Sequence, residues 1–137
     1  MALTVDASVA VKWFTDEPGF LDARALIATG ELFTAPDLLF AEIANVMWKK
    51  QRRGQASQAQ RLAAAERLPD LVRSVVPLAP LMARAAEMAE TLDHSAYDCF
   101  YLACAESTRT TLITADEPLI AAASRHGLAH LVTPLHA

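Results

Sequence analysis

The sequence has little cysteine and no long apolar run, and these two absences exclude broad classes of protein. Its two cysteines, Cys99 and Cys104, have no Cys-x-x-Cys pair or Cys/His ligand spacing beside them. The sequence therefore predicts neither a disulfide framework nor a zinc site, and we expect both thiols in the core. No apolar run approaches the roughly 18 residues of a membrane span. Because MALTVDASVAVKWF places Asp6 within its apolar run, it is typical of neither a signal peptide nor an anchor. We expect a cytoplasmic protein without a membrane partner.

An excess of positive charge is also missing. The chain has 12 Lys and Arg against 16 Asp and Glu, for a net charge of −4, which argues against a broad nucleic-acid-binding surface. The positive charges that are present gather in KKQRR, at Lys49, Lys50, Arg52 and Arg53. Cations favour helix C-termini, which is one explanation of the cluster. The other is a local phosphate-binding patch, and charge alone does not decide between them.

Repeats, low-complexity tracts and linkers are absent as well, so we expect a single domain over residues 1–137. Short β-type runs alternate with helical segments along the chain. The predicted strands are 2–5, 31–35, 71–78, 110–114 and 130–133, and the predicted helices are 9–14, 20–28, 37–51, 57–67, 80–91, 95–107 and 118–126. A capping box of Ser57 and Gln60 opens the fourth of these helices. The alternation predicts a mainly parallel sheet covered on both faces, an α/β sandwich.

Two acidic residues follow predicted strands, where open parallel sheets form their ligand sites. Asp6 directly follows LTV, and Asp116 follows TLIT after one intervening residue. Each also has a structural explanation, because either carboxylate could cap the helix that comes next. Taken singly, neither residue identifies a site.

Two further acidic residues lie on predicted helices. Glu42 shares a narrow polar stripe with Asn45 and Lys49, which a solvent-facing helix surface would explain. Asp98 is the only charged side chain between Ser95 and Ala105, in HSAYDCFYLACA. A capping box with Ser95 would explain its place in the first helical turn, but not the uncharged turns that follow.

Together, the four acidic residues favour a metal site. Carboxylates that converge on one cleft raise one another's pKa unless a cation lies between them. Because we see only oxygen donors, without His or Cys at ligand spacing, the set suits a hard ion such as Mg²⁺ or Mn²⁺. Such an ion polarises a phosphate and activates water.

At these residues the chain resembles the PIN-domain family, and in particular the VapC-type toxins of bacterial toxin–antitoxin pairs. VDASVAVKWF and PDLLFAEIANVMWK are similar to the family's first two motifs and place acids at Asp6 and Glu42. SAYDCFYLACAE and TLITADEPL are similar to the third and fourth and place acids at Asp98 and Asp116. The four motifs occur in family order and spacing over nearly the whole chain.

The resemblance implies a three-layer α/β/α sandwich and a metal-dependent endoribonuclease. Asp6, Glu42, Asp98 and Asp116 would hold one or two Mg²⁺ or Mn²⁺ ions, and hydrolysis of RNA would leave a 5′-phosphate and a 3′-hydroxyl. The implied partners are RNA, a small antitoxin protein and a second copy of the chain in a homodimer.

Further residues are weaker candidates. Ser8 and Thr114 match hydroxyl positions beside the first and last acids, although a helix hydroxyl and a strand threonine are also ordinary. Candidate RNA-binding residues are Lys12, Lys49, Lys50, Arg52 and Arg53. Trp13, Phe14 and Trp48 could stack on bases, or serve as core or dimer-interface residues.

Two other functions are alternatives to the nuclease, and the first is another α/β phosphotransfer protein. A phosphatase of the haloacid dehalogenase type needs a second Asp two residues after the first, where this chain has Ser8. A receiver domain needs an acidic pair near its start and a lysine after a late strand, and the sequence has neither. The other rival is a catalytically silent binding module of the same fold, which sequence alone does not exclude.

Overall fold

The computed structural model describes residues 2–136 and contains a five-stranded sheet in which every neighbouring pair of strands is parallel. The strands are β1 (Ala2–Val5), β2 (Leu32–Pro36), β3 (Val72–Val76), β4 (Thr111–Thr114) and β5 (Val132–Pro134). Their order across the sheet is β3-β2-β1-β4-β5. The predicted parallel α/β architecture is confirmed.

Seven α-helices join the strands within these residues. They are α1 (Ala7–Ala10), α2 (Phe20–Ala28), α3 (Leu38–Arg52), α4 (Gln58–Leu71), α5 (Met82–Leu92), α6 (Ala96–Thr108) and α7 (Glu117–Arg125). Short 3₁₀ turns at Val11–Trp13, Ala79–Leu81 and Ala129–Leu131 complete the connections. None of the described helices is both long and apolar enough to cross a bilayer.

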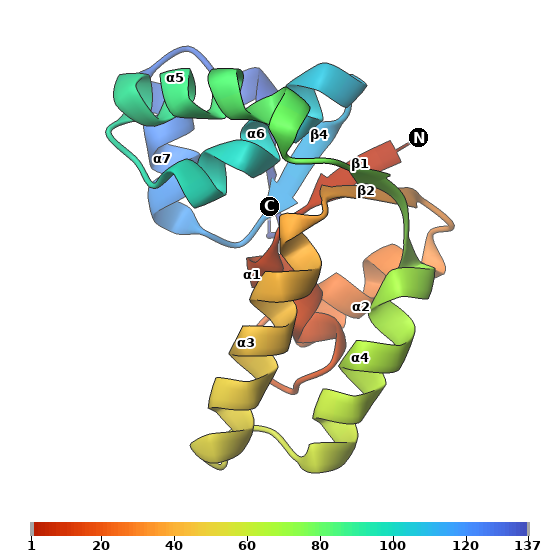
Figure 1. The fold of residues 1–137 in the computed structure, drawn as a ribbon. Coiled ribbons are helices and arrows are strands. Elements are labelled where there is room, and N and C mark those ends of the chain that lie inside the picture. Colours follow the sequence, from red (N-terminus) through yellow and green to blue (C-terminus); the bar gives the residue numbers. More distant parts are fainter. Residues whose placement is uncertain (1, 137) are drawn as a thin grey trace.

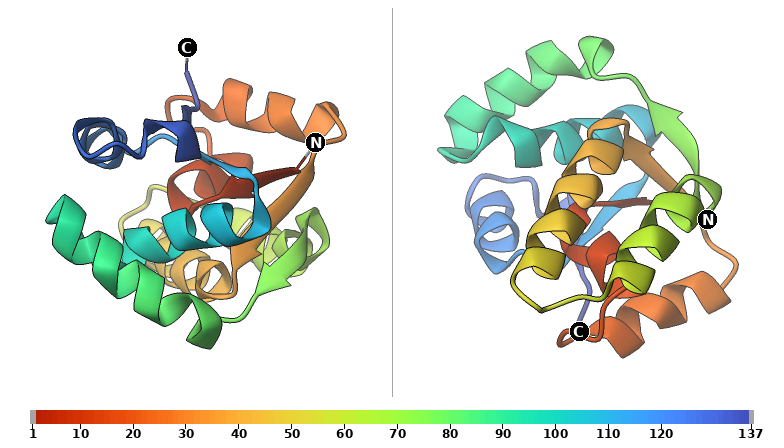
Figure 2. Two further views of the ribbon diagram at one scale, coloured as in Figure 1. Left: turned by 90° about the horizontal axis from the view of Figure 1, so that it is seen from above. Right: turned by 60° about the horizontal axis from the view of Figure 1, so that its bottom comes forward.

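The helices form a layer on each side of the sheet. Figure 1 shows α5 and α6 on one side of the strands and α2, α3 and α4 on the other, and the views of Figure 2 agree. The chain moves in one direction across the sheet from β1 to β3 and in the other from β4 to β5, so the order reverses between β1 and β4. Ligand sites in open α/β sheets form beyond the strands' carboxyl ends at such a reversal. Asp6 and Asp116 lie at this place.

The apolar helix α6 is the centre of the core. It packs against β1, β2 and β4, and this position explains the uncharged run that follows Asp98. The buried residues of α6 are Cys99, Tyr101, Leu102, Ala103, Cys104 and Ala105. The prediction that both cysteines are core residues is confirmed, and burial raises the pKa of each thiol to about 11.

Several predicted boundaries were wrong by a few residues. Helix α4 continues to Leu71 although Pro69 lies within it, because a proline in the last turn removes only one backbone hydrogen bond. Strand β3 is correspondingly shorter than predicted. The capping box of helix α4 is present as expected: Gln60 N donates to Ser57 Oγ at 3.0 Å, and Ser57 N donates to Gln60 Oε1 at 2.8 Å.

Candidate metal centre

Asp6 is held at the carboxyl end of β1 by three hydrogen-bond donors. Its Oδ1 accepts from Ser8 Oγ at 2.5 Å and from the Val9 amide at 3.3 Å, while its Oδ2 accepts from Thr114 Oγ1 at 2.5 Å. The Val9 bond is the helix cap that the sequence allowed. The carboxylate is 5% exposed, so its position is fixed by packing as well as by these bonds.

The hydroxyls of Ser8 and Thr114 tie Asp6 to the end of β4. Ser8 Oγ accepts from the Ala115 amide at 2.9 Å, and Thr114 Oγ1 accepts from the Asp116 amide at 3.1 Å. The same two hydroxyls donate to Asp6. The backbone that carries Asp116 is therefore positioned by the groups that position Asp6.

Asp116 is the N-cap of α7. Its Oδ1 accepts from the Leu119 amide at 3.2 Å, which is the capping role that the sequence allowed. Among residues 2–136, no hydrogen bond engages its Oδ2. A capping role and a ligand role are thus compatible, because they use different oxygens of one carboxylate.

Asp98 has a different partner from the one that the sequence suggested. Ser95 caps α6 by accepting from the Tyr97 amide at 3.2 Å, so the capping box of Ser95 and Asp98 does not form. Asp98 Oδ2 instead lies 2.7 Å from His94 Nε2. Although apolar turns follow it, Asp98 is not buried: its side chain is 31% exposed because the first turn of α6 lies at the rim of the core.

Glu42 is partly buried on α3 and accepts a hydrogen bond from a residue that sequence reasoning missed. Tyr101 Oη donates to Glu42 Oε1 at 2.8 Å. Tyr101 lies three residues after Asp98 on the same helix, so helical spacing was the available signal. An aromatic residue in an apolar run is otherwise typical of a core position, and Tyr101 is 1% exposed.

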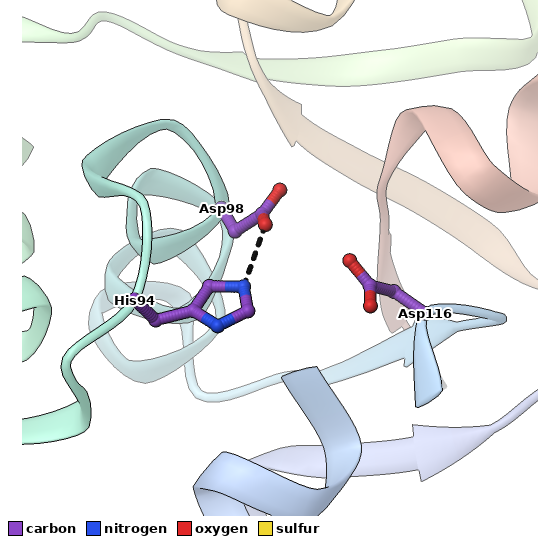
Figure 3. A group of neighbouring side chains, drawn as sticks. All are labelled: His94, Asp98 and Asp116. Atoms are coloured by element: carbon purple, nitrogen blue, oxygen red, sulfur yellow. Dashed lines mark hydrogen bonds and ion pairs between the residues drawn. The ribbon is translucent and has the colours of Figure 1, made fainter. Parts of the chain in front are cut away.

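The structure brings three of these side chains into one tight group. Single ligand atoms of His94, Asp98 and Asp116 lie within 4.8 Å of one another, and within residues 2–136 no other group of three or more such residues meets this criterion. Figure 3 shows them facing a common space from the α5–α6 turn, from α6 and from the start of α7. Asp6 and Glu42 lie outside this group, although both interact electrostatically with Asp98. Sequence reasoning overlooked His94, which precedes the helix, and the oxygen-only donor set stays a prediction.

The electrostatics of the site favour a cation. Burial raises the pKa of Asp6 to about 6 despite its hydrogen bonds, and the charge of Asp98 adds to the shift. Burial, together with Asp98, also raises the pKa of Glu42. No Lys or Arg of residues 2–136 pairs with any of the four acids. Converging carboxylates without a Lys or Arg partner are a donor set that fits a divalent ion.

Replacing Tyr101 by Phe tests how Glu42 is held. We expect Tyr101→Phe to lower the free energy of unfolding at pH 7 by about 1.5 kcal/mol, because a hydrogen bond to a charged acceptor is lost from a buried position. Tyr97→Phe on the exposed side of the same helix is the matched control and should change stability very little. Urea denaturation measures both variants, and equal stabilities would contradict this role of Tyr101.

The candidate RNA-binding residues divide into two sets. Lys12 and Lys50 pair with Glu17 at 3.3 and 3.2 Å, and both are largely covered. Lys49, Arg52 and Arg53 are exposed on the last turns of α3 and at its end. This division is a matter of geometry, and the contact with RNA stays a prediction.

The three aromatic candidates also differ in their surroundings. Trp13 and Phe14 are core residues, at 6% and 7% exposure, so stacking on bases was a wrong alternative for them. Trp48 is 48% exposed, and the Arg52 guanidinium lies 4.7 Å from the centre of its ring.

Comparisons with known proteins give one family and one fold. The profile of the PIN domain family matches residues 3–127. No curated protein sequence matches the chain. A Pyrobaculum aerophilum protein is 24% identical with a TM-score of 0.70, over 89% of this chain and 79% of that one.

Two other similar structures are those of VapBC2 and VapC20. VapBC2 from Rickettsia felis, bound to a DNA fragment from its promoter, is 13% identical with a TM-score of 0.70, over 98% of both chains. VapC20 of Mycobacterium tuberculosis, a sarcin-ricin loop cleaving toxin, is 21% identical with a TM-score of 0.70, over 88% of this chain and 95% of that one. At these identities, the likeness is one of fold.

Proposed function

This chain belongs to the PIN domain family, and from that premise we propose that it is a metal-dependent endoribonuclease and the toxin of a toxin–antitoxin pair. The observation that carries the proposal is the meeting of Asp98, Asp116 and His94 beside the buried Asp6, where the strand order reverses. The alternative is a catalytically silent binding module of the same fold, and the chelation experiment below distinguishes it from a nuclease.

In the proposed site, Asp6, Glu42, Asp98 and Asp116 hold one or two Mg²⁺ or Mn²⁺ ions. When bound, such an ion polarises the scissile phosphate and lowers the pKa of water. Hydrolysis would leave a 5′-phosphate and a 3′-hydroxyl.

The residues around the acids orient them. Ser8 and Thr114 each donate to Asp6 while accepting from the backbone beside Asp116, so they couple two ligands from neighbouring strands. Tyr101 holds one oxygen of Glu42 and leaves the other available. Such supporting hydrogen bonds fix ligand orientation in metal sites.

Chelation of the ion is the experiment that tests this function. We expect the purified chain to cleave RNA with Mn²⁺ or Mg²⁺, to lose this activity in excess chelator, and to recover it when the ion is restored. Glu42→Gln should be inactive under all three conditions. Cleavage that persists unchanged in chelator would exclude a metal-dependent nuclease, and a folded chain without cleavage in either ion would favour the binding module.

The antitoxin partner is supported by the likeness to VapBC2 and by an apolar groove. The groove has a volume of about 410 Å³ between α3 and α4, and its lining includes Phe40, Ile43, Met47, Trp48, Arg61 and Leu68. A homodimer is a further part of the proposal.

Expression of the wild-type chain, if it is a toxin, should arrest growth, whereas expression of the Glu42→Gln variant should allow growth to continue. Equal growth arrest by the two chains would contradict a nuclease toxin.

For RNA contact we propose the exposed set, Lys49, Arg52 and Arg53. Each phosphate contact contributes to the salt dependence of binding, because released counterions favour the complex at low salt. We expect Arg53→Ala to weaken RNA binding and to lower the slope of log affinity against log salt by about 1. Arg73→Ala, on strand β3, is the control. Equal slopes for the two variants, from fluorescence anisotropy, would exclude Arg53 as a phosphate contact.

A further inference from the structure

His94 takes its place from the backbone that ends α5. Asp93 adopts a left-handed conformation, with φ of 49°, and its amide donates to the Glu90 carbonyl. The His94 amide donates to the Ala89 carbonyl at 3.2 Å. These two bonds form a Schellman motif, which fixes the direction of the chain after the helix. His94 is therefore built into a defined turn rather than carried on a loose loop.

The imidazole is directed toward the carboxylates of the candidate metal centre. Its side chain is 17% exposed, and Nε2 lies 2.7 Å from Asp98 Oδ2. Figure 3 shows Asp116 across the same space. Adjacent ligands on an octahedral ion with bonds of about 2.1 Å are about 3.0 Å apart. The spacing of Nε2 and Oδ2 is close to this value, so an ion needs only a small adjustment to replace the hydrogen bond between them.

We propose that His94 Nε2 is a direct ligand of the ion that Asp98 and Asp116 hold, and that this nitrogen makes the centre bind Mn²⁺ in preference to Mg²⁺. The inference rests on the proposed function, since it needs an ion at the same centre. Its chemical basis is ligand type: imidazole suits transition-metal ions, whereas Mg²⁺ prefers oxygen ligands in near-ideal octahedral geometry and gives up its bound water reluctantly. A centre of carboxylates alone would offer only oxygen ligands, which suit Mg²⁺ as well as Mn²⁺.

Pulsed electron paramagnetic resonance of bound Mn²⁺ tests the nitrogen ligand without any assay of activity. Mn²⁺ alone is added to the metal-free full chain. We expect spin-echo modulation from a directly coupled ¹⁴N nucleus, which should change to the ¹⁵N pattern when the protein is grown with ¹⁵N-histidine. Because this measurement uses the unchanged chain, it does not depend on whether a variant folds.

Affinities of two His variants complete the test. We expect His94→Asn to remove the nitrogen modulation and to weaken Mn²⁺ binding by at least about tenfold, with a smaller change in Mg²⁺ affinity measured by competition. His126→Asn, at the opposite end of α7 from Asp116, is the control and should leave both affinities unchanged.

The outcomes separate this inference from the proposed function. Mn²⁺ that binds in an Asp116-dependent manner but shows no nitrogen coupling would overturn the role of His94 and leave the nuclease centre intact. Such a result would leave His94 as a hydrogen-bond partner that orients Asp98. Failure of the wild-type chain to bind Mn²⁺, or binding that Asp116→Asn does not weaken, would overturn both.

Discussion

Asp6→Asn is expected to lower RNA cleavage by about a thousandfold or more and, in the same protein without metal, to raise stability at pH 8. The loss of activity follows because an ion at this site supplies several kcal/mol of charge stabilisation, and each 1.4 kcal/mol is about tenfold in rate. The gain in stability follows because an ionised carboxylate is buried at this position. Activity and thermal unfolding, each measured with and without Mn²⁺, test the two effects separately.

Ionisation of the Asp6 carboxyl determines how the stability of the metal-free protein changes with pH. The pKa of Asp6 is raised from 3.8 to about 6 by burial, so the folded protein favours the protonated carboxyl. The stability that this proton contributes is fully present below about pH 4 and is lost as the pH rises through 6. At about 1.36 kcal/mol per pKa unit, the full loss is about 3 kcal/mol. Asn cannot ionise, so the advantage of Asp6→Asn should appear between pH 4 and pH 7 and remain at pH 8.

Added Mn²⁺ should reverse the order of the two proteins at pH 8. Binding stabilises the native state in proportion to the logarithm of ligand concentration over Kd, and the variant lacks one ligand. A variant that is less stable than the wild type in chelator at pH 8 would show that the hydrogen bonds of Asp6 to Ser8, Val9 and Thr114 outweigh the cost of its buried charge.

Asp98→Asn is expected to abolish cleavage to a similar degree, but with a different effect on stability. Asp98 is partly exposed and paired with His94, so removal of its charge should change the free energy of unfolding by about 1 kcal/mol or less. RNA cleavage and urea denaturation of the same preparation measure the two quantities.

Ser95→Ala is the matched control for this prediction. Ser95 caps the same helix by accepting from the Tyr97 amide, so its loss should cost about 1 kcal/mol of stability and leave cleavage near the wild-type rate. Marked unfolding of Asp98→Asn, with cleavage lost only in proportion to the unfolded fraction, would assign Asp98 a structural role instead.

Sequence patterns predicted the positions of the acids better than their surroundings. Strand runs and helical periodicity placed Asp6 after β1 and Asp116 near the end of β4, and the parallel order then brings these ends together. This works because hydrophobic periodicity and strand–helix alternation follow from burial in layers. The capping roles of Asp6 and Asp116 were also foreseeable, since an acid before a helix start is a local signal.

The contacts that cross between elements were not predictable from one sequence. Tyr101 reaches Glu42 across 59 positions, and such pairing depends on how α6 packs against α3. His94 was overlooked for a local reason. It lies outside the helix that carries Asp98, so helical spacing did not apply to it, although the Schellman turn brings it to the same carboxylate. Side-chain direction at a helix terminus depends on the turn, which the acid motifs do not encode.

The most direct test of the account is the anomalous scattering of crystals of the full chain soaked in Mn²⁺. We expect a strong peak beyond the carboxyl ends of β1 and β4, with oxygen atoms of Asp98 and Asp116 within bonding distance and with Asp6 beside it. The Asp116→Asn variant, soaked in the same way, should show a much weaker peak. A wild-type crystal with Mn²⁺ bound only elsewhere, or with no peak at these carboxylates, would contradict the claim that they form a metal centre.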